Sequence, residues 1–402
     1  MNILYIVSKF GPRVQGFAKY LKLEGYNVYL LDVHRCWFAL KDIDMNPPLV
    51  SPNVQLKNPP IMFENRILRI ATSLYRIIET IMHKIVKEKI DIIISYNPHI
   101  ATAFPAFIAS RLLGVPWILD YADLVAMYDT YNYPYAALEV TLAKKADGLI
   151  VLTNSWKSVL QRYWGIPNYK IVRIPNGIDL DIFNEEKMKN LDCEYFKAKL
   201  GINEEKIIGY LGSTAYRKTR WGYVDLQNVT SLIKAIPYII QKNSNIKFLF
   251  AGFNLDEKIA HLIKLLNIEE YIKMTGPYRY GSLEHLCYLK ISNIFWLSAA
   301  KSFSMEFFDR FKIYEYMICG KPIIAPCTIS MKEILGISYP FYKIDDPKSI
   351  ARVAEFFIEN PSFCEKIGKD LQFRVKKYYN WKALSKKLIH FLDDIYNNYR
   401  WK

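Results

Sequence analysis

The chain has 402 residues, of which 51% are hydrophobic and 15% are aromatic, so global disorder is excluded and two domains of ordinary size can each bury a core. Lysine and arginine number 54 against 39 acidic residues, which leaves a formal net charge of +15. This charge favours anionic partners such as nucleotide diphosphates, acidic lipid surfaces or nucleic acid, and it does not choose among them.

The N-terminal half opens with a predicted βαβ unit. An apolar strand at 2–7 leads through a loop to a helix at 14–23, which Gly25 ends, and a second strand follows at 26–32. A right-handed crossover makes these two strands parallel. A long helix is expected at 64–89, where isoleucines recur at helical spacing among arginines and lysines. It is either a core-facing helix with a solvated basic face or a surface that docks on an anionic membrane holding a lipid-linked acceptor.

Three more buried strands are predicted at 91–95, 116–120 and 146–153. The second of them delivers Asp120 and Asp123 at its carboxyl end, which is the edge where α/β sheets place functional groups. Either aspartate could orient an acceptor hydroxyl or bind a donor sugar hydroxyl. A helix cap or a loop hydrogen bond is an equally good interpretation of each. The run Pro175-Asn176-Gly177 after the next strand predicts a turn.

The C-terminal half begins with a charged connecting region at 185–202. A second series of strands follows at 207–211, 247–251, 272–275 and 294–297. The first of these strands ends at Gly212 and Ser213, where the backbone can approach phosphate oxygens. Arg217, Lys218 and Arg220 come next, in a loop before a helix that is expected to start near 225. The loop is either a set of cations that stabilises a departing diphosphate or an ordinary solvated basic loop.

The stretch 311–327 combines a helix at 312–318, a stop at Gly320 and a buried strand at 323–325. The first amides of this helix, among them those of Lys312 and Ile313, are expected to be unpaired donors. A phosphate could be held there by N–H groups and the helix dipole. Glu315 lies one turn into the helix and could accept hydrogen bonds from two sugar hydroxyls. Alternatively, Glu315 is an exposed first-turn carboxylate that the helix dipole favours.

Residues 312–322 read Lys-x-x-Glu-Tyr-Met-x-x-Gly-Lys-Pro, which resembles the nucleotide-sugar signature of family 4 glycosyltransferases, of the group 1 type. The resemblance implies that Glu315 binds the ribose hydroxyls and that the preceding backbone binds the diphosphate. It also implies that Arg217 and Lys218 stabilise the leaving diphosphate. Family members commonly carry a second glutamate, which contacts the donor sugar, at the position of Phe307. Glu306 is adjacent and could substitute for it.

The resemblance also implies the GT-B fold, an α/β architecture of two Rossmann-like domains whose doubly wound parallel sheets face a cleft. The first domain would span 1–184 and be completed by a helix at 380–402, and the second would span 185–379. The family's His-Asp pair near the sugar corresponds to Ala122 and Asp123, so only the aspartate is carried over. Asp123 therefore joins Arg217 and Lys218 as an expected catalytic residue.

The implied activity is retaining transfer of a sugar from a nucleotide-diphosphate sugar to a hydroxyl acceptor, which is a lipid-linked molecule or a growing glycan. No metal and no cofactor beyond the donor substrate are expected. Two alternatives stay open. One is a nucleotide-sugar-binding protein without turnover, since Phe307 and Ala122 replace polar groups of the family. The other is a sugar-nucleotide epimerase or phosphorylase on the same fold. Nucleic acid is not an expected partner, because no aromatic-basic recognition motif is present.

The cysteines and histidines bear on compartment and metal binding. Six cysteines are scattered without a Cys-x-x-Cys pair, which argues for a reducing compartment and against a zinc site or a disulfide framework. His261 and His285 fall in predicted helices, where ordinary surface or core roles are favoured over ligation. The N-terminal segment reads as a strand and not as a signal peptide. We therefore expect a cytoplasmic protein, soluble or peripheral on the inner face of an anionic membrane.

Overall fold

The structure is a computed structural model that describes residues 1–7, 11–32, 37–39, 75, 78–79, 81–83, 88–98, 101–123, 133–212, 216–219, 222–225, 227–252 and 257–400. The chain divides into two compact units, of which the first comprises Met1–Pro175 and Trp381–Lys402 and the second comprises Asn176–Asn380. The first unit is therefore discontinuous in sequence. Its boundaries lie at 175/176 and 380/381, whereas the sequence analysis places them at 184/185 and 379/380.

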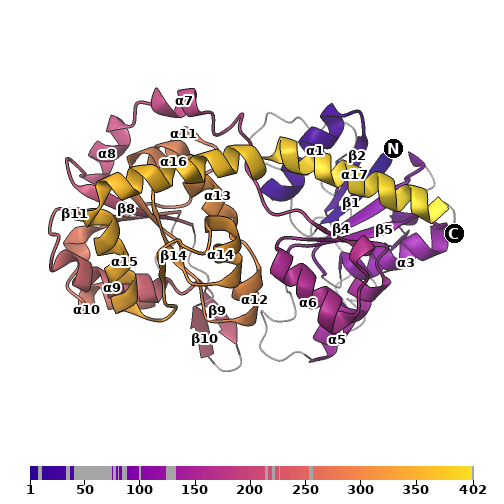
Figure 1. The fold of residues 1–402 in the computed structure, drawn as a ribbon, viewed down its shortest axis with the longest axis horizontal. Helices are drawn as coiled ribbons and strands as arrows, with labels where there is room; N and C mark the ends of the chain where they lie inside the picture. The colour runs from indigo at the N-terminus through magenta and orange to yellow at the C-terminus, as the bar shows by residue number, and fades with distance from the viewer. Residues whose placement is uncertain are drawn as a thin grey trace. The chain divides into compact units, whose positions relative to one another are not determined.

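The first unit is built on a seven-stranded sheet with the order β3-β2-β1-β4-β5-β6-β7 among the described residues. All neighbouring strands in it are parallel except β2 and β3. The strands are β1 (Asn2–Val7), β2 (Asn27–Asp32), β3 (Trp37–Ala39), β4 (Ile92–Tyr96), β5 (Trp117–Tyr121), β6 (Gly148–Val151) and β7 (Ile171–Arg173). The helices are α1 (Pro12–Leu23), α3 (Ala103–Leu113), α5 (Tyr133–Lys145), α6 (Asn154–Trp164), the 3-10 turn η1 (Asn168–Lys170) and α17 (Trp381–Arg400) (Figure 1).

Helix α17 ends the chain and packs against α1, at its beginning (Figure 1). The ring of Trp381 meets the ring of Phe17 edge to face, with centroids 5.1 Å apart. Gly16 permits this approach, because a Cβ at that position would lie 2.4 Å from the Trp381 ring. The last helix of the chain thus completes the core of the first unit.

The second unit holds a six-stranded, fully parallel sheet with the order β12-β11-β8-β13-β14-β15 in the described part of the chain. Its strands are β8 (Lys206–Leu211), β11 (Ile246–Ala251), β12 (Ile272–Met274), β13 (Ile294–Trp296), β14 (Ile323–Pro326) and β15 (Phe341–Tyr342). Its helices are α7 (Glu185–Lys189), α8 (Glu194–Leu200), α9 (Val229–Ile240), α10 (Glu257–Leu265), η2 (Glu269–Tyr271), α11 (Leu283–Ile291), α12 (Phe303–Phe307), α13 (Phe311–Ile318), α14 (Ile329–Leu335), α15 (Pro347–Glu359) and α16 (Pro361–Tyr378).

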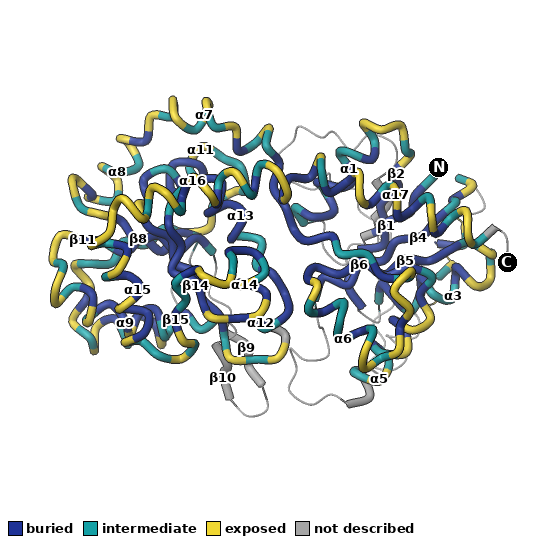
Figure 2. Tube along the Cα trace, in the orientation of Figure 1, coloured by how far each residue is buried: buried dark blue, intermediate teal, exposed yellow. Residues whose placement is uncertain are grey.

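Both sheets are buried along most of their strands, which Figure 2 shows as dark blue tube in each unit. Parallel sheets covered by helices on both faces need near-continuous apolar strands, and runs such as 3–7 and 248–251 supply them. The prediction of an α/β protein with two Rossmann-like parallel sheets is therefore confirmed.

Two local expectations in the second unit are wrong. The segment after β8 contains an antiparallel hairpin of β9 (Tyr216–Thr219) and β10 (Gly222–Asp225) where a loop was predicted. Aromatic and β-branched residues in this segment favour strands. The helix that follows begins at Val229 and not near 225.

The structure also joins Cys193 and Cys287 in a disulfide with a Cα–Cα distance of 5.4 Å, a pairing that the argument against a disulfide framework did not anticipate. The two residues are 94 positions apart, so only the packing of α8 on α11 brings them together. Most of the predicted basic helix at 64–89 lies outside the described residues.

Candidate functional site

The carboxyl edge of the second sheet collects the candidate binding groups. β8 ends at Leu211 and β11 ends at Ala251, each followed directly by a glycine, and the two strands run parallel with Leu211 opposite Ala251. Parallel strands bring their carboxyl ends to one edge, where the ligands of open α/β folds bind. Helix α13 is attached to the same edge, because the amide of Leu211 donates a 2.9 Å hydrogen bond to the hydroxyl of Tyr316.

The ammonium group of Lys312 lies directly over the end of β8. Its Nζ is 4.1 Å from the centroid of the Tyr210 ring, which is a favourable cation–π distance. A Cβ on Gly212 would lie 2.2 Å from this Nζ, and Gly212 has a φ of +150°. Glycine therefore allows both the backbone conformation and the close approach of the cation. The sequence motif points to the backbone amide of Lys312, and the structure adds its side-chain charge at the same edge.

Glu315 lies on the same helix and is buried, with 5% of its surface exposed. The interpretation of Glu315 as an exposed first-turn carboxylate is therefore wrong. Its Oε2 is 3.4 Å from Nε2 of His285, whose side chain is fully buried. Within the described residues, His285 is the only basic side chain at ion-pair distance from this carboxylate. Glu315 is thus held in a buried setting that no lysine or arginine described in the structure neutralises.

Two buried tyrosines lie close enough to Glu315 for its charge to affect them. Burial, followed by the negative charge of Glu315, raises the pKa of Tyr278 and of Tyr280 well above the ordinary tyrosine value. Both phenols therefore remain protonated at neutral pH. The Tyr280 hydroxyl is buried and has no hydrogen-bond partner among the described residues, so it can donate to an acceptor brought by a ligand. Tyr278 stacks on His285 with ring centroids 4.7 Å apart.

The start of α13 differs from the expectation of unpaired first-turn amides. The amide of Ile313 donates a 3.0 Å hydrogen bond to the carbonyl of Arg310, and its side chain is fully buried. A bond between residues three apart tightens the first turn of the helix and uses a donor that an ideal α-helix leaves unpaired. The expectation that the Ile313 amide is unpaired is therefore wrong.

Glu306 lies on α12 and contacts the start of α14. Its Oε2 accepts a 3.1 Å hydrogen bond from the amide of Ile329, the first residue of that helix. A carboxylate at a helix N-terminus is stabilised by the unpaired amides and by the helix dipole. Phe307, at the position of the family's upstream glutamate, is buried. Glu306 thus has a structural partner, and its role at a donor sugar stays a prediction.

Arg217 and Lys218 lie on β9, opposite Val224 and Tyr223 of β10 in the hairpin. The structure describes their backbone and not their side chains, and Ser213 and Arg220 lie outside the described residues. Whether these cations approach Lys312 or Glu315 therefore stays a prediction.

The two candidate aspartates of the first unit have different partners. Asp120 is fully buried, and both of its oxygens accept hydrogen bonds from Arg13. Asp123 lies just after β5, where its Oδ2 accepts a 3.1 Å hydrogen bond from the side-chain amide of Asn97. Asn97 in turn accepts a hydrogen bond from the amide of Ala122. Asp123 is only partly buried and so is the more accessible carboxylate of the two.

His285 is the site residue that sequence reasoning missed. Ser282 caps α11 by accepting a hydrogen bond from the His285 amide, which places His285 in the first turn of the helix. A serine three residues before the histidine is a recognisable helix-start pattern. It predicts where the helix begins, but only packing turns the imidazole towards Glu315.

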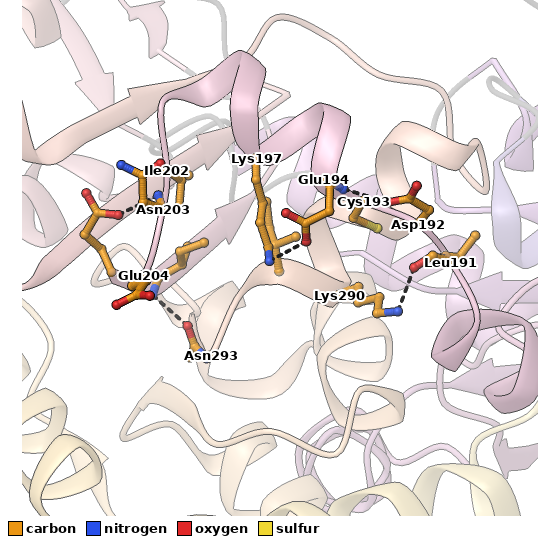
Figure 3. A pocket seen from close by; sticks show the side chains of 13 residues that line it. Leu191, Asp192, Cys193, Glu194, Lys197, Ile202, Asn203, Glu204, Lys290 and Asn293 are labelled. Atoms are coloured by element: carbon orange, nitrogen blue, oxygen red, sulfur yellow. Dashed lines mark hydrogen bonds and ion pairs between the residues drawn. The ribbon is translucent and has the colours of Figure 1, made fainter.

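A cavity of about 330 Å³ lies away from these groups, beside the amino end of β8. Its lining includes Cys193, Lys197 and Asn293, and it contains none of the predicted site residues. Lys197 donates a 2.8 Å hydrogen bond to the Glu194 carboxylate, and Lys290 donates a 2.7 Å hydrogen bond to the carbonyl of Leu191. Figure 3 marks both interactions with dashed lines. These charged groups are satisfied by their neighbours, so the cavity does not compete with the carboxyl edge as a candidate ligand site.

The described residues contain no group of three or more histidine, cysteine, aspartate or glutamate side chains that could hold a metal ion. None of the helices described here has the length and apolar character that crossing a membrane requires.

The sequence matches two family models. Residues 13–182 match the model described as Glycosyltransferase Family 4, and residues 206–360 match the model described as Glycosyl transferases group 1. No curated protein matches the chain in sequence.

Solved structures resemble the whole chain. Sucrose-phosphate synthase from Thermosynechococcus elongatus has a TM-score of 0.72 at 15% identity, covering 99% of this chain and 100% of its own. HepE of Anabaena, solved in complex with UDP-glucose, has a TM-score of 0.71 at 15% identity, covering 98% and 100%. UDP-GlcNAc 2-epimerase from Neisseria meningitidis, bound to UDP-GlcNAc, has a TM-score of 0.60 at 16% identity, covering 98% and 100%. At these identities the similarity concerns the fold.

Proposed function

Because the chain is a GT-B glycosyltransferase of the group 1 type, we propose that it transfers a sugar from a nucleotide-diphosphate sugar to a hydroxyl acceptor, with retention of anomeric configuration and without a metal ion. The observation that carries this proposal is the pairing of Lys312 and Glu315 on one helix at the carboxyl edge of the second sheet. An ammonium over Gly212 suits a diphosphate, and a buried carboxylate one helical turn away suits ribose hydroxyls.

In this proposal the protein supplies charge and orientation and forms no covalent intermediate. The bond between the anomeric carbon and the diphosphate oxygen breaks, and the acceptor oxygen bonds to that carbon on the same face. The departing phosphate oxygen takes the acceptor's hydroxyl proton. Lys312, with Arg217 and Lys218 of the hairpin, neutralises the charge that develops on the diphosphate, which is the largest electrostatic demand of the step.

The remaining candidates have supporting roles in the same proposal. The backbone at Gly212 and Ser213 lies beside the diphosphate, and Glu306 contacts the donor sugar through the oxygen that does not cap α14. Asp123, held by Asn97, accepts a hydrogen bond from the acceptor hydroxyl and so orients it. These assignments predict that Asp123→Asn lowers the rate of transfer more than it lowers the affinity for the donor.

The decisive experiment separates transfer from epimerisation, which the same fold also supports. The protein is incubated with UDP-, GDP- and ADP-sugars, and products are followed by NMR and by release of the free nucleoside diphosphate. Hydrolysis or transfer releases the diphosphate, whereas epimerisation produces a new sugar nucleotide and releases none. Release that EDTA does not abolish, with the product anomer matching the donor anomer, supports the retaining and metal-independent proposal. A new sugar nucleotide without diphosphate release would replace it with the epimerase.

We also propose that the acceptor is lipid-linked or part of a growing glycan, reached at the cytoplasmic face of an anionic membrane. The net charge of +15 and the basic segment at 64–89 support this part of the proposal. Sedimentation with vesicles tests it. We expect binding to phosphatidylglycerol vesicles at low salt, loss of that binding at high salt, and no binding to phosphatidylcholine vesicles. Equal behaviour towards both lipids would remove the membrane from the proposal.

A further inference from the structure

We propose that His285 is a positioning residue for Glu315, and that its Nε2–H holds this carboxylate in the orientation that receives the donor's ribose. The inference rests on the proposed function, because it assigns the ribose to Glu315. It adds a residue that touches no substrate and that acts through the carboxylate beside it.

The protonation of His285 is set by its own backbone. The amide of Gly281 donates a 3.0 Å hydrogen bond to Nδ1 of His285, so Nδ1 serves as an acceptor and cannot carry the proton. In the neutral imidazole the proton is then on Nε2. This is the nitrogen that lies 3.4 Å from Oε2 of Glu315. The hydrogen bond at one ring nitrogen thus prepares the other nitrogen to donate towards the carboxylate.

The imidazole ring has little freedom to turn away. Tyr278 stacks on it with an interplanar angle of 13°, and the Phe183 ring meets it edge to face at 6.0 Å. The His285 side chain is fully buried. A ring fixed by stacking, by an edge contact and by a backbone hydrogen bond presents its Nε2–H in one direction.

Within the described residues, Glu315 is the only acidic side chain at ion-pair distance from this nitrogen. Nε2 of His285 is buried and has no hydrogen-bond partner among the described residues. Its distance of 3.4 Å from Oε2 of Glu315 is longer than a normal N–H···O bond. A buried N–H without an acceptor is costly, so a small movement of the carboxylate towards it is favourable. Contacts of this kind are often long without substrate and shorten when the substrate binds.

The chemistry of a neutral histidine suits this role. An arginine or lysine beside Glu315 would neutralise it and compete with the ribose for both oxygens. A neutral imidazole instead donates towards Oε2 only and does not cancel the negative charge of Glu315. Oε1 has no hydrogen-bond or ion-pair partner within the described residues, so it can accept from a ribose hydroxyl. His285 therefore restricts the rotamer of Glu315 without weakening it as an acceptor.

The experiment compares a ribose ligand with its dideoxy analogue in each variant. Binding of UDP, GDP and ADP, and of their 2′,3′-dideoxy forms, is measured by titration calorimetry. For the tightest ligand, we expect the wild type to bind the ribose form about tenfold more tightly than the dideoxy form, as one hydrogen bond to a charged group gives. His285→Leu should reduce this ratio to near one, and His285→Gln, whose amide can still donate, should keep about a threefold ratio.

The ratio separates positioning from a general structural role, which would weaken both ligands by the same factor and leave the ratio unchanged. An unchanged ratio in His285→Leu overturns the inference. His261→Gln, at an exposed position of α10, is the matched control and should behave as the wild type. A wild type that binds none of the nucleotides would contradict the proposed function itself. If Glu315→Gln keeps the wild-type ratio of ribose-form to dideoxy-form affinity, only the assignment of the ribose to Glu315 is contradicted.

A measurement on the wild type keeps the test independent of whether the variants fold. In a spectrum of ¹⁵N-labelled histidine, we expect His285 to show the tautomer with the proton on Nε2. We also expect its Nε2 resonance to move when the ribose nucleotide is added and to move much less with the dideoxy analogue. The opposite tautomer, or equal shifts with both ligands, would overturn the inference.

Discussion

The guanidinium group of Arg13 binds the carboxylate of Asp120 through two hydrogen bonds of 2.8 Å, and both side chains are almost fully buried. Arg13 also donates to the carbonyls of Ile174 and Pro175, the last residues before the second unit begins. The Arg13 side chain therefore connects α1 and β5 to the carboxyl end of the segment Met1–Pro175 of the first unit. The sequence suggests Asp120 as a possible ligand of a sugar hydroxyl, but both of its oxygens accept hydrogen bonds from Arg13.

Replacing Arg13 by glutamine should strongly destabilise the first unit. Removing one partner of a buried ion pair leaves an uncompensated charge and typically costs about 3–5 kcal/mol. The free energy of unfolding in urea measures the loss. Arg111→Gln is the control, because Arg111 pairs with Asp147 at a partly exposed site and should cost less than about 1 kcal/mol. Equal losses in the two variants would contradict the role assigned to the Arg13–Asp120 pair.

Replacing Gly16 by alanine should disturb the contact between α1 and α17. The added Cβ would lie 2.4 Å from the Trp381 ring, so the two helices must move apart. Overpacking of this kind typically costs about 1–3 kcal/mol, which a thermal or urea unfolding curve detects. Gly11→Ala serves as the control, since a Cβ there meets nothing within 4 Å. A Gly16→Ala variant as stable as Gly11→Ala would show that the helices adjust without cost.

Replacing Lys312 by methionine should weaken binding of a nucleoside diphosphate about tenfold, because a charge-assisted contact to phosphate is lost. Affinity for the corresponding nucleoside should change little. Calorimetric titration of both ligands measures the difference, and the loss should shrink at high salt. Lys332→Met, at an exposed position of α14, should leave both affinities unchanged. Equal weakening of nucleoside and diphosphate would place Lys312 away from the phosphates.

Glu185 predicts a pH dependence of stability in the second unit. Hydrogen bonds from Lys376 and Lys189 lower the pKa of Glu185 from 4.5 to about 2. Because the folded pKa lies below the unfolded value, the stabilisation is complete above pH 4.5 and disappears as the pH falls towards 2. The pair with Lys376 is partly exposed, so its contribution should be below about 1 kcal/mol.

The test compares wild type and Glu185→Gln by urea unfolding between pH 6 and about pH 3. The wild type should be the more stable at pH 6, and the difference should narrow as the pH falls. Glu204→Gln, at an exposed glutamate of the same unit, should show no such trend. A constant difference across the range would contradict the lowered pKa.

The local sequence was sufficient for most of the fold. Apolar runs at 2–7, 207–211 and 247–251 and the glycine after 312–318 predict strands and a helix that the structure contains. These signals succeed because a parallel strand buried on both faces must be apolar along its length. The hairpin at 216–225 was not predicted, because its charged residues interrupt the apolar pattern and resemble those of a loop.

The candidate site was predicted in part. Glu315 and Lys312 were selected from a motif of neighbouring residues, and the structure brings both to the carboxyl edge of the second sheet. His285 and the Cys193–Cys287 disulfide were missed. Each depends on two segments far apart in sequence, and no local pattern states which helix packs beside which.

By itself, the sequence determined the alternation of strands and helices and the motif that carries Glu315, because these depend on neighbours along the chain. Tertiary structure alone decided that Arg13 binds Asp120 and that Glu315 is buried. It also decided that, among the described residues, an imidazole is the basic group at ion-pair distance from Glu315. The physical reason is that burial and pairing energies depend on distances between segments that the order of residues does not specify.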